Sequence, residues 1–230
     1  MNILALDTSG PACSVAVLRD GTLAYEARAV NRKTHSRSLM PMVREALERA
    51  GLEAKDVSLV SAVVGPGSFT GVRIAVAAAQ GMARGLGVPC LPVNALEAMA
   101  ASCQLGDGEV VCPIRDARGG QVYGAAFRGG IRLIQDAALP LAEFLAMVEP
   151  LGERLYFLGD GVAPSKAAIG QALGARARFA PAHGILPGAA TAALIAHLHP
   201  ERAVAPGELL PVYLRAPQAE RARAQSNGRD

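Results

Sequence analysis

The sequence predicts an α/β fold in which the element order β-β-β-α-β-α occurs twice, giving two lobes. Strand-like and helix-like segments alternate, and the apolar run 57–64 is typical of a strand in a sheet covered on both faces. The two halves also share a register. Asp7 lies six residues before a strand that begins at Cys13, and Asp116 lies six residues before one at Val122. We therefore expect a duplication, with chance similarity of two small hairpins as the alternative.

The first half contains local signals for most of its elements. Gly21 lies in a hairpin turn, Gly51 has the position of a glycine that ends a helix, and Asn94 with Glu97 forms a capping pair. The expected elements are strands 3–6, 12–18 and 23–29, a helix over 36–50, strand 57–64, a helix over 71–84, strand 88–93 and a helix from 95.

The second half repeats this order more loosely. The expected elements are strands 110–114, 121–127 and 131–135, a helix over 141–148, strand 155–158, and helices over 163–173 and 189–199. Duplicated lobes with an acidic residue at the end of each first strand are the architecture of the actin-like ATPase (ASKHA) superfamily, in which nucleotide lies between the lobes. We expect lobes over 1–105 and 106–216, and a disordered tail over 217–230, which is polar and rich in arginine.

Composition excludes several functional classes. The chain has 230 residues, 51% hydrophobic content, a net charge of +3 and no tryptophan, which gives no indication of a nucleic-acid surface. No apolar run reaches the roughly 18 residues of a membrane helix, and the start lacks a basic leader, so we expect a cytoplasmic protein that does not bind membranes. The cysteines are expected to be buried reduced thiols because no Cys-x-x-Cys occurs. The histidines have no metal-ligand spacing, so we expect neither metal nor cofactor.

The glycine-rich segment 65–71 leads from a strand into an unusually apolar helix. Glycines allow close approach of the backbone, and Ser68 or Thr70 can cap the helix, so the segment predicts an anion site or a docking site. It is not a Walker loop, because Val72 occupies the lysine position.

Four residues are candidates for a vestigial nucleotide or phosphate site: Asp7, Thr8, Ser9 and Asp160. Simple turns are the alternative, and Pro11 removes one backbone donor from the first of them. The segment 115–118 places three charges beside the expected cleft, as an ion-pair cluster or as a contact for a charged ligand. We expect no catalytic residue.

The helices over 36–50 and 71–84 are both apolar over a wide arc. One side should cover the sheet, and the other should meet a second helix of this chain or another subunit. We favour an intermolecular helical bundle. The residues expected at this partner interface are Leu39, Met42, Val43, Ala46, Val72, Arg73, Val76, Ala77 and Gln80.

Several segments together resemble the TsaB (YeaZ) family over about residues 1–215. They are residues 3–9, 13–17, 35–41, the specific Gly-Pro-Gly-Ser-Phe-Thr-Gly-Val-Arg at 65–73, 116–123 and 211–215. The resemblance implies an actin-like fold and a noncatalytic scaffold required for threonylcarbamoyl transfer to adenosine 37 of tRNAs that read ANN codons. It implies a heterodimer with the catalytic paralogue TsaD, an ATPase partner TsaE and indirect contact with tRNA. In isolation the chain is expected to form a homodimer that competes with the heterodimer.

The resemblance also bears on catalysis. The stretch of TsaD that is similar to residues 93–99 has two histidines, one helical turn apart, which hold its catalytic metal. This chain has Ala95 and Met99 at those positions. Alanine cannot coordinate a metal and a thioether is a poor ligand for such an ion, so we expect a partner and not an enzyme. The alternative is an actin-like ATPase or small-molecule kinase that uses Asp7 and Asp160, and a metallopeptidase is a remote third.

Overall fold

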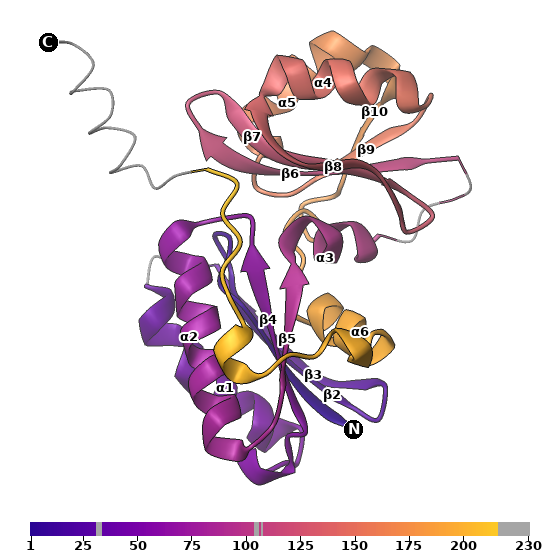
Figure 1. Cartoon of the computed structure of the whole chain (residues 1–230). Coiled ribbons are helices and arrows are strands. Elements are labelled where there is room, and N and C mark those ends of the chain that lie inside the picture. The colour runs from indigo at the N-terminus through magenta and orange to yellow at the C-terminus, as the bar shows by residue number, and fades with distance from the viewer. Residues whose placement is uncertain (31–33, 104–105, 107, 216–230) are drawn as a thin grey trace, which may run out of the picture.

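A computed structural model describes residues 1–30, 34–103, 106 and 108–215 and contains two five-stranded sheets, one above the other in Figure 1. The strand orders are β3-β2-β1-β4-β5 and β10-β9-β6-β7-β8. Read from the opposite edge, the second order repeats the first, so each half contributes three antiparallel strands followed by two parallel ones. This equivalence confirms the predicted α/β duplication at the level of topology.

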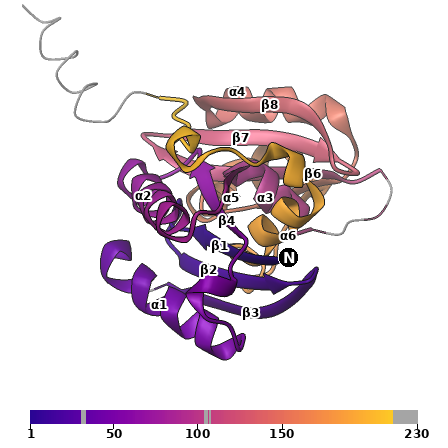
Figure 2. The same ribbon diagram turned by 60° about the horizontal axis from the view of Figure 1, so that its bottom comes forward.

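The first sheet has helices on both faces, as Figure 2 shows for α1 (His35–Arg49) and α2 (Phe69–Leu86) on one side and α6 (Ala190–Leu198) on the other. Alternate residues of β1 enter different clusters, since Leu4 and Leu6 pack towards α1 and α2 whereas Ile3 and Ala5 pack towards α3 and α6. The elements are β1 (Asn2–Asp7), β2 (Cys13–Arg19), β3 (Thr22–Ala29), α1 (His35–Arg49), β4 (Leu59–Gly65), α2 (Phe69–Leu86), β5 (Cys90–Asn94) and α3 (Ala95–Ala101).

The second sheet packs against α4 and α5 on one face and against α3 on the other, which places α3 between the lobes (Figure 1). Its elements are β6 (Val110–Arg118), β7 (Gln121–Arg128), β8 (Ile131–Pro140), α4 (Leu141–Val148), β9 (Leu155–Leu158), α5 (Val162–Leu173) and β10 (Ala177–Phe179). The sequence pattern did not predict β10, which has only three residues, and it ended β6 and β8 too early.

The chain returns to the first lobe after β10. Helix α6 (Ala190–Leu198) packs on the first sheet through small residues, and the following segment forms a bridge between Cys90 and Val204. The main-chain N–H of Val212 then donates to the oxygen of Val64 at 2.7 Å. The sequence prediction grouped all of 106–216 with the second lobe. The difference arises because the alanine face of α6 fits closely on the first sheet.

Cap residues fix the ends of the helices much as predicted. Gly51 follows α1 with a φ of 67°, and the Asn94 side chain accepts the N–H groups of Leu96 and Glu97 at 2.9 Å. At α2 it is Ser68, not Thr70, that caps the helix, by accepting the Gly71 N–H at 3.2 Å.

Glycines at the start of α2 let this helix dock on the β1–β2 turn. The Thr8 hydroxyl donates to the oxygen of Gly71 at 2.6 Å, and the Ser68 N–H donates to the oxygen of Ser9 at 2.8 Å. A Cβ on Gly67 would collide with the main-chain oxygen of Ser9, and a Cβ on Gly71 would collide with the main-chain oxygen of Thr8. The glycine-rich segment was predicted to be an anion site or a docking site. In the structure it is the point at which α2 docks on the β1–β2 turn of the same chain.

No helix among the described residues is long and apolar enough to cross a membrane. The predicted tail over 217–230 lies outside the described residues.

Candidate functional site

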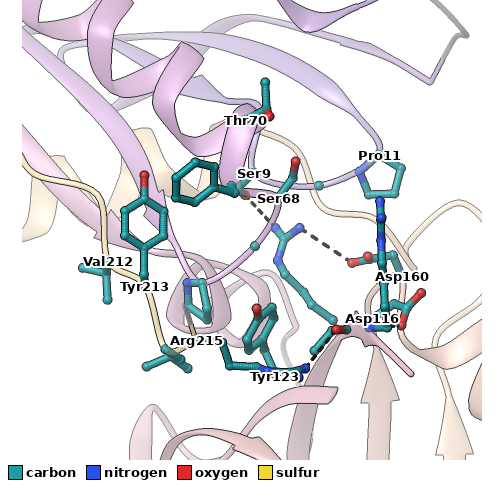
Figure 3. A pocket seen from close by; sticks show the side chains of 18 residues that line it. Ser9, Pro11, Ser68, Thr70, Asp116, Tyr123, Asp160, Val212, Tyr213 and Arg215 are labelled. Atoms are coloured by element: carbon teal, nitrogen blue, oxygen red, sulfur yellow. Dashed lines mark hydrogen bonds and ion pairs between the residues drawn. The ribbon is translucent and has the colours of Figure 1, made fainter. Parts of the chain in front are cut away.

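A cavity of about 590 Å³ lies between the lobes. Its walls come from the β1–β2 turn, the first residues of α2, the end of β6, the loop after β9 and the C-terminal segment 212–215. Figure 3 shows Ser9, Ser68 and Pro11 on one side of this cavity and Asp116, Tyr123 and Asp160 on the other. The structure therefore brings together the two halves of the predicted nucleotide or phosphate site.

The β1–β2 turn uses its polar groups internally. Asp7 Oδ1 accepts the Ser9 N–H at 2.8 Å and the Ser9 hydroxyl at 2.5 Å, and the Thr8 hydroxyl is committed to Gly71. Thr8 and Ser9 are fully buried. These are the contacts of a side-chain turn that closes a hairpin, the alternative that the sequence had left open.

An arginine of the second lobe lies in the floor of the cavity. The side chain of Arg115 is only 7% exposed, and its Nη2 donates to the Ser9 hydroxyl at 2.9 Å. The same nitrogen lies 4.0 Å from Asp7 Oδ2, and Nη1 lies 3.6 Å from Asp160 Oδ1. Dashed lines in Figure 3 join this guanidinium to Ser9 and to Asp160. The predicted ion-pair cluster at 115–118 thus extends across both lobes.

The environment of Asp160 is unfavourable for a carboxylate. Burial raises the pKa of Asp160 above its ordinary value, and the neighbouring Arg115 opposes this rise. Backbone hydrogen bonds at Asp160 and Asp116 also lower this pKa, and the charge of Asp116, whose side chain accepts the N–H of Arg118 at 2.7 Å, raises it by a smaller amount. The guanidinium of Arg115 is therefore the counter-charge on which the ionised form of Asp160 depends.

Most of the predicted partner-interface residues are buried in the first lobe. Helix α1 packs on α2, and both pack on the sheet, so apolar positions around most of α2 are covered within the chain. This corrects the expectation that the following side chains face a partner: Leu39, Val43, Ala46, Val72 and Val76. Arg73 and Ala77 are exposed, and Met42 and Gln80 are partly exposed.

The C-terminal segment covers part of α2 that the sequence left unassigned. The Gln80 side chain donates to the oxygen of Leu209 at 2.9 Å, and Leu209 is fully buried. Arg73 stacks 3.9 Å above the ring of Phe69 and donates from Nε to the Tyr213 hydroxyl at 2.9 Å. The sequence did not predict that Tyr213 and Leu209 contact α2. Their partners on α2 are 140 and 129 positions away along the chain, and such distant contacts leave no local sequence pattern.

Two positions on α3 bear on metal chemistry. Ala95 is 1% exposed and lies in the core of the first lobe, and Met99 is 3% exposed and packs against the second lobe. A Cβ on Gly159 would meet the methyl group of Met99. Neither side chain suits a divalent metal: Ala95 lies in an apolar cluster, and Met99 packs in a second apolar cluster and also lines a small pocket beside Asp7, Arg115 and Asp160.

No group of three or more metal-ligating side chains occurs among the described residues. All four cysteines are free thiols, and Cys13, Cys90 and Cys112 are buried. Burial raises the pKa of Cys13 to about 11, and Asp7 adds to the effect. A thiol so protonated is a poor nucleophile at neutral pH.

Comparison with known proteins places these features in context. The family model for TsaD, tRNA N6-adenosine threonylcarbamoyltransferase, matches residues 29–200. The chain is 34% identical over 227 residues to the tRNA threonylcarbamoyladenosine biosynthesis protein TsaB of Bacillus subtilis, with 96% of each chain covered.

Two solved structures resemble this chain, one in both sequence and fold and the other in fold alone. YeaZ from Pseudomonas aeruginosa matches with a TM-score of 0.74 at 30% identity, covering 93% of this chain and 99% of that chain. The Lmo2764 protein of Listeria monocytogenes, provisionally described as an N-acetylmannosamine kinase, matches with a TM-score of 0.52 at 12% identity, covering 87% of this chain and 100% of that chain. The second likeness shows the fold alone and agrees with the predicted actin-like class.

Proposed function

The chain belongs to the TsaB (YeaZ) family, and we propose from this premise that it acts in the biosynthesis of threonylcarbamoyladenosine on tRNA as a noncatalytic subunit. In this role it binds a TsaD-type catalytic paralogue and stabilises the active assembly by mass action. The modified base is adenosine 37 of tRNAs that read ANN codons.

One observation carries the noncatalytic part of the proposal. Ala95 and Met99 occupy the helix positions that resemble the metal ligands of the paralogue, and both are buried in apolar packing. A metal at this point would need donor atoms that these side chains lack, and it would displace the core contacts of α3. The helix is retained as an element that packs the two lobes together, without a donor set for a metal.

The exposed part of α2 is the surface that we assign to the paralogue. Arg73, Ala77, Gly81 and Arg84 are exposed at helical spacing, and the sheet and α1 hold α2 rigidly from behind. Small side chains at positions 77 and 81 permit close approach of a second helix. The arginines at either end supply residues of a type enriched in binding hot spots. Met42 on α1 and Gln80 on α2 lie partly exposed and complete the proposed contact.

Other partners follow from this assembly. We assign a TsaE-type ATPase to a composite surface of the heterodimer, and tRNA contact to the complex and not to this chain alone. In the absence of the paralogue, the α2 face is expected to pair with a second copy, so the chain should elute as a dimer whose formation the paralogue suppresses.

Reconstitution of tRNA modification tests the function. The chain, the TsaD-type paralogue and the TsaE-type ATPase of the same organism are mixed with tRNA, threonylcarbamoyl-adenylate and ATP, and modified adenosine is measured by mass spectrometry of digested tRNA. The complete mixture should give product, while omission of this chain should abolish it. Product from this chain alone would show that it is an enzyme, and full product without it would remove the scaffold role.

A further inference from the structure

The cleft between the lobes is where an actin-like fold would hold Mg²⁺ and the phosphates of a nucleotide. A carboxylate, hydroxyls and turn amides of the first hairpin would face them from one lobe, and the loop at Asp160 from the other. Both segments flank the cavity in this chain. The fit of such a ligand therefore depends on which of these groups are available and on what lies between them.

The first hairpin has few groups left for a phosphate. The Ser9 N–H and hydroxyl both donate to Asp7, and the Thr8 hydroxyl donates to Gly71. Pro11 contributes no N–H at all. A phosphate oxygen would have to break these buried contacts before it could gain any of the same donors. The residues present do not fit the phosphate group.

The position between the carboxylates is filled. The guanidinium of Arg115 contacts Ser9 and lies 4.0 Å from Asp7 and 3.6 Å from Asp160. It also packs against the turn so closely that a Cβ on Gly10 would collide with it. A divalent cation at this point would overlap the arginine and meet its positive charge at contact distance.

The same side chain joins the lobes. Arg115 comes from β6 of the second lobe, whereas Ser9 and Asp7 come from the β1–β2 turn of the first. With its side chain 7% exposed, the contact is screened little by solvent. Asn94 of the first lobe and Asp136 of β8 form a second hydrogen bond between the lobes, beside α3.

We propose that Arg115 is a built-in cation that takes the place of Mg²⁺ between Asp7 and Asp160, holds the lobes together and excludes Mg-nucleotide from the cleft. We refer to Arg115 with Ser9, Asp7 and Asp160 as the Arg115 latch. The latch belongs to this chain alone and does not depend on the partner proposed above. It keeps the lobe angle fixed whether or not Mg-nucleotide is present in solution, so a partner meets one invariant surface.

Thermal unfolding of the full chain tests the latch. The probes are MgCl₂ alone and Mg-ADP, both at millimolar concentration, and the variants are Arg115→Met and the double variant Arg115→Met/Asp160→Asn. Arg118→Met is the matched control, because Arg118 lines the same cavity but is exposed. Arg118→Met removes one positive charge from the cavity, as Arg115→Met does, but leaves the contacts of Arg115 with Ser9, Asp7 and Asp160 in place.

Three results are expected. The wild-type Tm should stay within about 1 °C when Mg-ADP is added. Arg115→Met should lower Tm by about 6–12 °C, because two partly buried carboxylates lose their counter-charge, while Arg118→Met should change it by less than about 2 °C. MgCl₂ should raise the Tm of Arg115→Met by at least about 2 °C but should not affect the double variant, which lacks one carboxylate.

Two results would overturn the latch. One is a rise in wild-type Tm with Mg-ADP, accompanied by saturable binding in calorimetry. The other is an Arg115→Met protein that is as stable as wild type or that does not respond to Mg²⁺. If Arg115→Met does not fold, the double variant should fold, since it removes one of the two uncompensated carboxylates and with it their mutual repulsion; a double variant that also fails to fold contradicts the ion-pair origin of the effect.

Discussion

The hydroxyl of Thr8, the residue that follows β1, donates a hydrogen bond of 2.6 Å to the main-chain oxygen of Gly71 in the first turn of α2. The two residues are 63 positions apart, and Thr8 is fully buried. This contact fixes the start of α2 against the hairpin turn. It thereby aligns the helix whose outer face we assign to a partner with the turn that borders the cleft.

Substitution at Gly71 should disturb this alignment. A Cβ there would overlap the main-chain oxygen of Thr8. Gly71→Ala should therefore lower the free energy of unfolding, measured by urea denaturation, by about 1–3 kcal/mol. The matched control is Gly81→Ala in the same helix, where a Cβ would meet nothing within 4 Å. That change should raise stability by about 0.5–1 kcal/mol. Equal effects of the two substitutions would contradict the docking of α2.

Neighbouring positions of α2 should respond oppositely to a charge. Val76 is 4% exposed and packs in the first-lobe core, so Val76→Glu should cost about 3–5 kcal/mol of stability or prevent folding. Ala77 is exposed, and Ala77→Glu should change stability by less than about 0.5 kcal/mol. Circular dichroism during urea unfolding measures both. A stable Val76→Glu protein would show that this face is not core.

The pH dependence of stability should report on Asp160. Its folded-state pKa lies above the ordinary value of 3.8, so the folded protein binds more protons than the unfolded chain between these two values. The stability from this carboxyl is therefore fully present below the unfolded pKa and is lost as pH rises through the folded pKa. Burial is the main cause of the raised pKa, Arg115 is the main opposing influence, and backbone hydrogen bonds at Asp160 and Asp116 oppose the rise as well.

Arg115→Met removes the charge that most strongly opposes this shift. The loss of stability should become larger and move to higher pH. The Tm difference between wild type and variant should thus be smallest at acidic pH and should grow as the pH rises. A Tm difference that does not change with pH would mean that Asp160 does not interact with Arg115.

Thiol reactivity tests the environment of the cysteines. Burial raises the pKa of Cys90 to about 11 and also raises that of Cys112, so both should react slowly with an aromatic disulfide reagent in the native protein, as should Cys13. Cys103 is only half-buried and should react first. Without reductant, the denatured chain should release the signal of all 4 thiols. A smaller number in denaturant would reveal a disulfide.

Local signals in the sequence predicted much of the fold. Gly51 ends α1 through a backbone conformation that glycine adopts easily, and Asn94 caps α3 through its own side chain, so a few neighbouring residues determine each end. The repeated spacing after Asp7 and Asp116 predicted the duplication because each hairpin is itself a local unit. Short β10 escaped prediction because three residues give no periodicity.

The parts of the site that could not be predicted from the sequence are those that depend on contacts between residues far apart in the chain. The composition of α2 showed that most of its surface must be covered, but it could not show that Leu209 and Tyr213 of the same chain supply part of that cover. The charge pattern at 115–118 likewise indicated an ion-pair cluster without naming Ser9 as a partner. These contacts depend on the return of the chain after β10 and on the packing of the two lobes, neither of which has a local signature.

The affinity of the chain for its TsaD-type paralogue tests the central claim most directly. Isothermal titration should compare wild type with Ala77→Glu on α2 and with Ala167→Glu, an exposed helical alanine of α5 in the other lobe. We expect Ala77→Glu to weaken binding by about 30-fold or more and Ala167→Glu to leave it unchanged. Equal affinities for all three proteins, or no binding by the wild type, would contradict the account of this chain as a scaffold that acts through α2.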